Sequence, residues 1–167
     1  RVLETAPGVI LVRDVASDSH LELPTVPGDA DRLRDVELRP FREAARDGLE
    51  SVMTGHLAVP GLGERDDVPA TLSTRILGDV VRGELGFTGL VVTDALDMGG
   101  VKNALPAEEV AVRALLAGAD VLLMPPDPLA ARSAVVAAVT AGRVPAARLD
   151  DAVRRILEMK RRVGLLG

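Results

Sequence analysis

The stretch that most constrains the fold is residues 85–100, which read L-G-F-T-G-L-V-V-T-D-A-L-D-M-G-G. Residues 90–92 form a short apolar run of the kind found in strands buried on both faces, as in a parallel sheet. The run stops at Thr93 and Asp94, so the Asp94 carboxylate is predicted at the carboxyl edge of the sheet, where α/β proteins bind ligands. On this stretch alone, a cap for the following helix is an equally open interpretation of Asp94.

Two more short apolar runs, at residues 51–54 and 121–124, alternate with segments of helical periodicity. Helices are predicted at residues 29–48, 73–85, 106–116, 127–139 and 148–163, and a further strand at 9–12. Pro40 is expected to bend or divide the first helix. Alternation of strands and helices predicts parallel strands joined by right-handed crossovers, and a spacing of roughly 30–40 residues between strands suits one βα unit of a barrel.

Composition excludes several classes of function. The chain is 47% hydrophobic and 27% charged, which suits a soluble globular domain. It has two Phe, no Tyr, no Trp and a net charge of −5, which argues against nucleic acid as a partner. The same scarcity of aromatic residues means that any aromatic side chain stacking on a sugar would have to come from outside this chain. No Cys is present, which removes disulfides and thiolate zinc sites. No membrane span or signal peptide is evident, so we expect a soluble protein and favour a cytoplasmic over an exported location.

Three blocks, in chain order, carry a resemblance to a known family. Residues 86–101, G-F-T-G-L-V-V-T-D-A-L-D-M-G-G-V, resemble the nucleophile signature of family 3 glycoside hydrolases, in the β-N-acetylglucosaminidase branch. Residues 18–20, D-S-H, resemble the general acid/base loop of that branch, and residues 52–56, V-M-T-G-H, resemble the strand between them. The resemblance begins at about residue 14, whereas residues 1–13 lack the family's Lys-His-Phe-Pro-Gly-His-Gly block.

The resemblance implies a (β/α)8 TIM-type barrel of which residues 14–167 are the C-terminal portion, preceded by an unmatched segment at 1–13. It also implies a retaining exo-β-N-acetylglucosaminidase that works without metal or organic cofactor on a small carbohydrate substrate. Asp94 would be the nucleophile, His20 the general acid/base, and Asp18 the residue that orients the His20 ring.

The residue types suit this chemistry. A retaining glycosidase needs a nucleophile and a proton donor on either side of one bond, usually two carboxyl groups about 5–5.5 Å apart. Imidazole, with an unperturbed pKa near 6.5, can also supply a proton near neutral pH. Asp-Ser-His by itself is more typical of a solvated loop, but the chain has only two His, His20 and His56, and both fall in the family's blocks.

Other polar residues have blander interpretations. His56 has a structural interpretation, in which it caps its strand end or packs beneath the site, and a functional one, in which it contacts the sugar. Both interpretations remain open. Asp97 is expected to cap a helix, and Asp120, just before the strand at 121–124, is expected to be structural. The glycines at positions 83, 86 and 89 precede their strand, so they do not form a dinucleotide-binding fingerprint.

Two alternatives accompany the hydrolase hypothesis. The first is a phosphorylase, because a neutral histidine repels incoming phosphate less than a carboxylate does. The second is an inactive, truncated part of a barrel. Half a barrel leaves an open sheet edge, so self-association of the chain is also expected.

Overall fold

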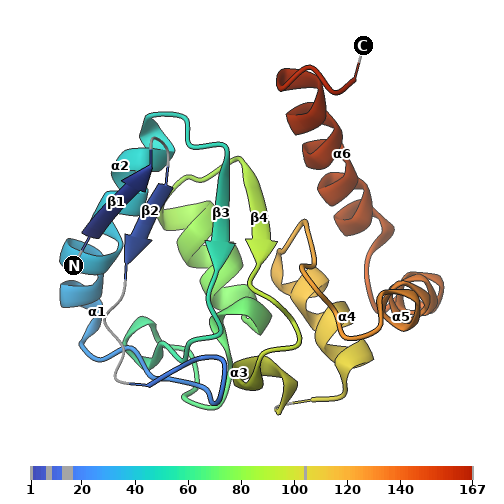
Figure 1. The fold of residues 1–167 in the computed structure, drawn as a ribbon, viewed down its shortest axis with the longest axis horizontal. Coiled ribbons are helices and arrows are strands. Elements are labelled where there is room, and N and C mark those ends of the chain that lie inside the picture. The colour runs from blue at the N-terminus through green and yellow to red at the C-terminus, as the bar shows by residue number, and fades with distance from the viewer. Residues whose placement is uncertain (1, 7–8, 13–16, 104, 167) are drawn as a thin grey trace.

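The computed structural model describes residues 2–6, 9–12, 17–103 and 105–166 (Figure 1). The strands are β1 (Val2–Ala6), β2 (Val9–Val12), β3 (Ser51–Thr54) and β4 (Leu90–Thr93). The longer helices are α2 (Arg39–Arg46), η4 (Arg75–Glu84), α4 (Ala107–Ala117), α5 (Pro128–Thr140) and α6 (Ala146–Arg162). Short helical turns are α1 (Ala30–Arg32), η1 (Leu33–Glu37), η2 (Pro60–Leu62), η3 (Ala70–Leu72) and α3 (Gly99–Lys102). The expected division between residues 13 and 14 lies outside the described residues.

The parallel pairing predicted for the two central strands is confirmed. β3 and β4 run parallel in register from Ser51 opposite Leu90 to Thr54 opposite Thr93, so both strands end level with each other. β4 alternates half-buried and fully buried residues, and Val91 has no exposed surface. The chain is therefore an α/β protein with parallel strands, and helices cover them in Figure 1.

The strand predicted at residues 121–124 is shorter than expected. It lies parallel to β4, but within the part of the chain that the structure describes its strand-type pairing is limited to a single bridge between Val121 and Val92. The amide that would make the next bond of the ladder belongs to Leu123. It donates to the Thr93 hydroxyl (2.9 Å) instead of a β4 carbonyl, so the backbone ladder is interrupted. Met124 then takes a positive φ of 45°, which turns the chain out of the extended conformation.

The predicted helices are confirmed, except that one of them is divided into two. The helix expected at 29–48 is split between η1 and α2, where Pro40 occupies the first turn of α2. The Ser73 hydroxyl accepts a hydrogen bond from Ile76 N–H (3.0 Å) at the start of η4, and Asp127 accepts two from the first turn of α5. Gly118 and Gly142, with φ of 127° and 72°, end α4 and α5.

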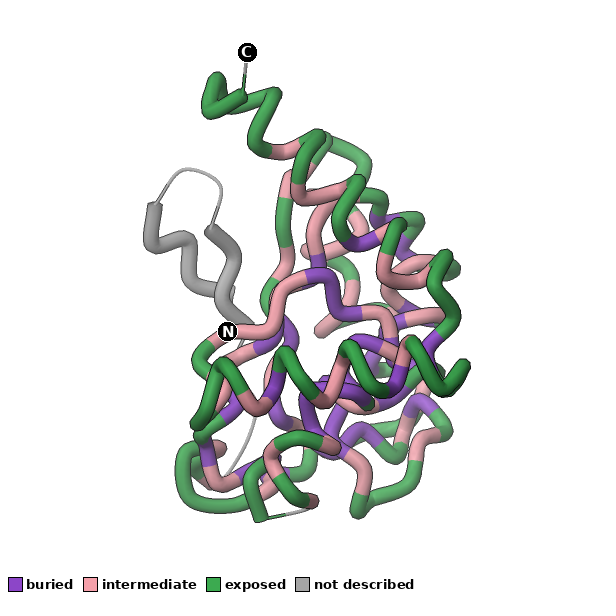
Figure 2. Tube along the Cα trace, turned by 90° about the vertical axis from the view of Figure 1, so that its right-hand side faces the viewer, coloured by how far each residue is buried: buried purple, intermediate pink, exposed green. Residues whose placement is uncertain are grey.

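The main core lies between the β3–β4 pair and the helices packed on it. Leu77 and Val80 of η4, together with Phe87, Val91 and Ala114, belong to this cluster. A smaller cluster joins α4, α5 and α6, and the far end of α6 is exposed in Figure 2. β1 and β2 form an antiparallel hairpin, which confirms the strand expected at residues 9–12. Across the described residues, no helix combines the length and the apolar character that crossing a membrane requires.

Candidate active site

Asp94 stands directly after β4, at the carboxyl edge of the β3–β4 pair. Its N–H donates to Thr54 O of β3 (2.9 Å), which extends the parallel pairing by one step. Its carboxylate oxygen Oδ1 accepts a hydrogen bond from the N–H of the next residue, Ala95 (2.8 Å). The following helix begins only at Gly99 and receives no hydrogen bond from Asp94, so the helix-cap interpretation of Asp94 fails.

Several successive backbone groups at and just after Asp94 are hydrogen-bonded. The carbonyl of Ala95 accepts a hydrogen bond from His56 Nε2 (2.8 Å), and Leu96 N–H donates to Leu123 O (3.0 Å). Together with the Asp94 and Ala95 bonds, these contacts hold the strand-end turn against β3 on one side and against the 121–124 segment on the other. A half-buried carboxylate on such a turn has a defined position, as a nucleophile requires.

His56 lies at the same sheet edge as Asp94, two residues beyond β3. It is completely buried, and its Nδ1 lies 2.9 Å from the Thr71 hydroxyl oxygen. Burial lowers the pKa of the His56 imidazole, and the hydrogen bond to Ala95 O and the charge of Asp94 oppose that shift only in part. Both ring nitrogens face protein atoms, so the geometry favours packing beneath the site over a direct contact with sugar.

His20 and Asp18 form a hydrogen-bonded pair on an exposed loop. Asp18 Oδ1 accepts from the His20 backbone N–H (2.9 Å) and lies 2.7 Å from His20 Nδ1. The side chains are 67% and 55% exposed, so the pair is open to a ligand. The contact between Asp18 and His20 that the resemblance implies is therefore present: Nδ1 is turned toward a carboxylate, and Nε2 is the ring nitrogen that this contact does not use.

Gly99 and Gly100 seat this loop on the turn that follows Asp94. Gly99 N–H donates to His20 O (2.9 Å) and Gly100 N–H to Ser19 O (3.0 Å). A Cβ atom at Gly99 would stand 2.4 Å from Leu21 O, which only a glycine avoids. The glycine pair thus brings the His20 loop to the strand end that carries Asp94. Its role was missed at the sequence level, although the G-G dipeptide directly after the Asp94 stretch was a visible signal.

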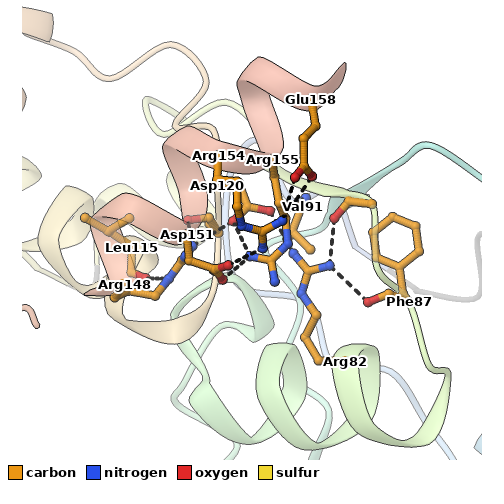
Figure 3. Close-up of polar contacts among 12 residues, drawn as sticks. Arg82, Phe87, Val91, Leu115, Asp120, Arg148, Asp151, Arg154, Arg155 and Glu158 are labelled. Atoms are coloured by element: carbon orange, nitrogen blue, oxygen red, sulfur yellow. Dashed lines mark hydrogen bonds and ion pairs between the residues drawn. The ribbon is translucent and has the colours of Figure 1, made fainter. Parts of the chain in front are cut away.

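Three further polar residues complete the description. The Asp97 prediction is wrong: the residue before α3 that occupies the cap position is Met98, and Asp97 is exposed. Asp120 is buried at the opposite edge of the sheet, where its carboxylate accepts from Val91 N–H (3.0 Å) at the start of β4 (Figure 3). Thr71 is fully buried beside His56, and the sequence did not indicate it because a threonine in a short loop segment matches no site motif. Within the described residues no cluster of three His, Asp or Glu side chains is placed to hold a metal ion.

The chain is similar in sequence to known proteins. Residues 12–159 match the family model described as the glycosyl hydrolase family 3 N terminal domain. A beta-hexosaminidase of Alkalilimnicola ehrlichii is 42% identical over 110 residues, which cover 66% of this chain and 31% of the relative. A beta-N-acetylglucosaminidase/beta-glucosidase of Cellulomonas fimi is 34% identical over 133 residues, which cover 75% of this chain and 24% of the relative.

Solved structures agree. A family 3 beta-N-acetylglucosaminidase from Paenibacillus sp. strain FPU-7 superposes with a TM-score of 0.85 at 43% identity, covering 89% of this chain and 29% of that one. A beta-glucoside phosphorylase superposes with a TM-score of 0.84 at 30% identity, covering 89% of this chain and 28% of that one. The chain thus spans less than a third of the length of each of these four proteins.

Proposed function

Because the chain belongs to glycosyl hydrolase family 3, we propose that it supplies the catalytic edge of a retaining exo-β-N-acetylglucosaminidase. Residues 14–167 would be the C-terminal portion of a (β/α)8 barrel whose other strands lie outside this chain. The parallel β3–β4 pair and the family match over residues 12–159 support this architecture. The substrate class, terminal β-linked N-acetylglucosamine, is supported by the names of the Paenibacillus and Cellulomonas relatives.

One observation carries the proposal. The loop that holds the Asp18–His20 pair is bonded through its backbone to Gly99 and Gly100, on the turn that follows Asp94. These backbone contacts support a shared site in which the Asp94 carboxylate and the His20 imidazole act on one substrate. These are the two groups that a family 3 enzyme of this branch needs.

The first chemical step breaks the glycosidic bond. A carboxylate oxygen of Asp94 bonds to the anomeric carbon while the bond from that carbon to the leaving oxygen breaks and its electron pair stays on the oxygen. The leaving oxygen takes the proton from Nε2 of protonated His20, so an alcohol departs and a glycosyl-aspartate remains. Asp18, through Nδ1, keeps Nε2 directed outward and stabilises the imidazolium while it is charged.

The second step restores the enzyme. Neutral His20 Nε2 takes a proton from water as the water oxygen attacks the anomeric carbon, and the Asp94 carboxylate leaves. The product keeps the stereochemistry of the substrate because two displacements have occurred. No metal or organic cofactor takes part in either step.

A second function has a specific observation in its favour. The similarity to a solved beta-glucoside phosphorylase indicates that phosphate can replace water in this architecture. A phosphate oxygen would then attack the anomeric carbon as the bond to the Asp94 carboxylate breaks, which forms a sugar 1-phosphate without His20 acting as a base. His20 Nε2 would regain its proton from solvent before the next cycle. A third possibility is a barrel part that packs but has no turnover.

The test uses the product of the complete reading frame that contains this chain. A 4-nitrophenyl β-N-acetylglucosaminide is supplied with and without phosphate, and the sugar products are identified. Free N-acetylglucosamine in both conditions supports hydrolysis, whereas the 1-phosphate supports the phosphorylase. Asp94→Asn should abolish turnover and prevent covalent labelling by a fluorinated glycosyl donor, while Asp97→Asn, a neighbouring exposed carboxylate, should retain both. Labelling of any other residue would refute the assignment of Asp94.

A further inference from the structure

A row of three buried polar side chains lies beneath Asp94. The Thr54 and Thr71 hydroxyl oxygens are 2.9 Å apart, and Thr71 Oγ1 is 2.9 Å from His56 Nδ1. At the far end of the row, His56 Nε2 is 2.8 Å from the carbonyl oxygen of Ala95, the residue after Asp94. Thr71 and His56 have no exposed surface, and Thr54 is nearly as buried. Because the groups are this deeply buried, their hydrogen-bond partners are other protein atoms, either within the row or in the adjoining backbone.

The proton positions follow from the acceptors. Because a carbonyl oxygen only accepts, Nε2 must carry the proton that it donates to Ala95 O. Burial lowers the pKa of His56, so the ring is neutral at pH 7 and Nδ1 presents a lone pair. The donor facing Nδ1 is the Thr71 hydroxyl, whose oxygen in turn accepts from Thr54. Thr71 Oγ1 also lies 3.1 Å from Gly55 O, which is a second possible acceptor. The hydroxyl has a single proton, so donating it to Gly55 O would leave His56 Nδ1 without a donor.

The row meets the backbone at Ala95. The Ala95 N–H donates to the Asp94 carboxylate, and the Ala95 carbonyl oxygen accepts from His56 Nε2 (2.8 Å) and from Met98 N–H (3.2 Å). The N–H and the carbonyl belong to adjacent peptide groups joined at the Ala95 Cα, so a change in the Ala95 dihedral angles alters their relative directions. The direction of the Asp94 carboxylate is therefore coupled to the ring that holds the Ala95 carbonyl, and the ring to the hydroxyl that holds Nδ1.

We propose that Thr71 is a positioning residue for Asp94: its hydroxyl donates to Nδ1 and holds the His56 ring in place, and Nε2 of that ring then holds the turn that orients the carboxylate. Thr71 itself touches no substrate. The proposal rests on the role assigned to Asp94 for its effect on turnover, but the hydrogen-bond row is independent of that role.

The first measurement needs no variant. Nitrogen-15 spectra of the imidazoles of the wild-type protein should show His56 with a protonated Nε2 and an unprotonated Nδ1. A proton on Nδ1 at pH 7 would overturn the proposal, because Thr71 would then accept from the ring and a neutral His56 would have no proton on Nε2 with which to hold the Ala95 carbonyl.

The variants test the coupling. Thr71→Val keeps the shape but removes the donor, so we expect the His56 Nδ1 resonance and the amide resonances of Ala95 and Leu96 to shift. Thr71→Ser keeps the hydroxyl and should restore them. In the complete protein, Thr71→Val should lower kcat by about 10–100-fold with KM nearly unchanged, the penalty expected for a misplaced reacting group.

Ser73→Ala is the matched control, because Ser73 is equally buried on the same segment but its hydroxyl caps η4 and not the His56 row. It should destabilise the protein without moving the His56 signals or kcat. If Thr71→Val does not fold, Thr54→Val takes its place, with a smaller shift of the same resonances expected. Unchanged His56, Ala95 and Leu96 signals in the folded variant would refute the proposal. A coupled row in a protein without glycosidase activity would instead refute the proposed function and leave the row intact.

Discussion

At the scale of single residues, Asp94 and His20 are held in different ways. Asp94 stands at a strand end where the backbone groups from residue 94 to residue 96 are bonded to β3, His56 and the 121–124 segment. His20 stands on an exposed loop, held by Asp18 and by the two glycines that follow the Asp94 turn. The proposed nucleophile is thus fixed, while the proposed proton donor faces solvent.

Replacing His20 should separate substrates by their leaving groups. His20→Ala removes the proton donor, so turnover of alkyl N-acetylglucosaminides should fall far more than that of activated aryl glycosides, whose leaving oxygen needs little protonation. Asp18→Asn should lie between the wild type and His20→Ala, because it disorients the ring without deleting it. Steady-state kinetics on the two substrate classes checks this. An equal loss on both would mean that His20 only binds substrate.

His56 should make stability depend on pH. Burial lowers its pKa in the folded chain, whereas the unfolded chain has the ordinary value of about 6.5. As the pH falls below about 6.5 the unfolded state binds a proton that the folded state does not, so the free energy of unfolding should decrease, by at most about 1.4 kcal/mol per pH unit. Urea unfolding at pH 7.5 and 5.5 measures this, and His56→Gln should flatten the dependence. The same slope in both proteins would contradict the assignment to His56.

At the scale of elements, Asp120 ties together parts of the chain that are distant in sequence. Its buried carboxylate accepts from Arg82 of η4 (2.7 Å) and from Arg148 (2.8 Å) and Arg155 (3.4 Å) of α6, as Figure 3 shows. Burial lowers the pKa of the Arg82 guanidinium, and Asp120 is the charge that opposes this most. The cluster lies at the edge of the sheet opposite Asp94, so it anchors α6 without taking part in the site.

Asp120→Asn should therefore loosen α6. It leaves Arg82, Arg148 and Arg155 without the charge that they share, and breaking such a buried arrangement costs about 3–5 kcal/mol. Urea unfolding should show the loss, and hydrogen exchange should place it in α6. The control is Glu158→Gln on the exposed face of the same helix, where removing an ion pair with Arg154 should change stability by less than about 1 kcal/mol. Equal effects of the two variants would show that Asp120 is not the anchor.

At the scale of the whole molecule, the short parallel sheet leaves several large apolar side chains of the strands and helices exposed. Large apolar side chains, among them Met53 of β3, Met124, and Val153 and Leu157 of α6, are between 44% and 58% exposed. The described chain pairs β3 and β4 with each other and adds one bridge at Val121. An open edge of this kind favours association with another chain.

We therefore expect the isolated chain to self-associate or to be poorly stable, with little hydrolase activity. Sedimentation velocity across a range of concentrations, together with a thermal unfolding curve, measures this directly. Dilution should shift the distribution toward monomer if association through the open edge is reversible. A monomer that unfolds cooperatively and has full turnover would contradict the expectation.

Local patterns in the sequence are sufficient for the order and type of the main elements. The uninterrupted run at residues 90–92 predicts a buried parallel strand, and the strand end places Asp94 at its edge. Periodicity, Ser73, Asp127 and the glycines at 118 and 142 predict the helices and most of their ends, because these signals act within one turn of backbone. The contact between Asp18 and His20 is one that the resemblance to the family's acid/base loop implies.

Only the tertiary structure decides what lies next to these elements. Thr71 contacts His56, and Gly99 contacts the His20 loop, because the fold packs together segments that are distant in sequence. The shortened pairing at Val121 likewise depends on the Thr93 hydroxyl, which takes the Leu123 amide that a strand ladder would use. Asp120 is a single carboxylate in the sequence, and it becomes the anchor of α6 only when three arginines from two helices converge on it. Such contacts depend on packing between residues that are distant in sequence. The residues next to each of them therefore do not indicate which partner it will contact.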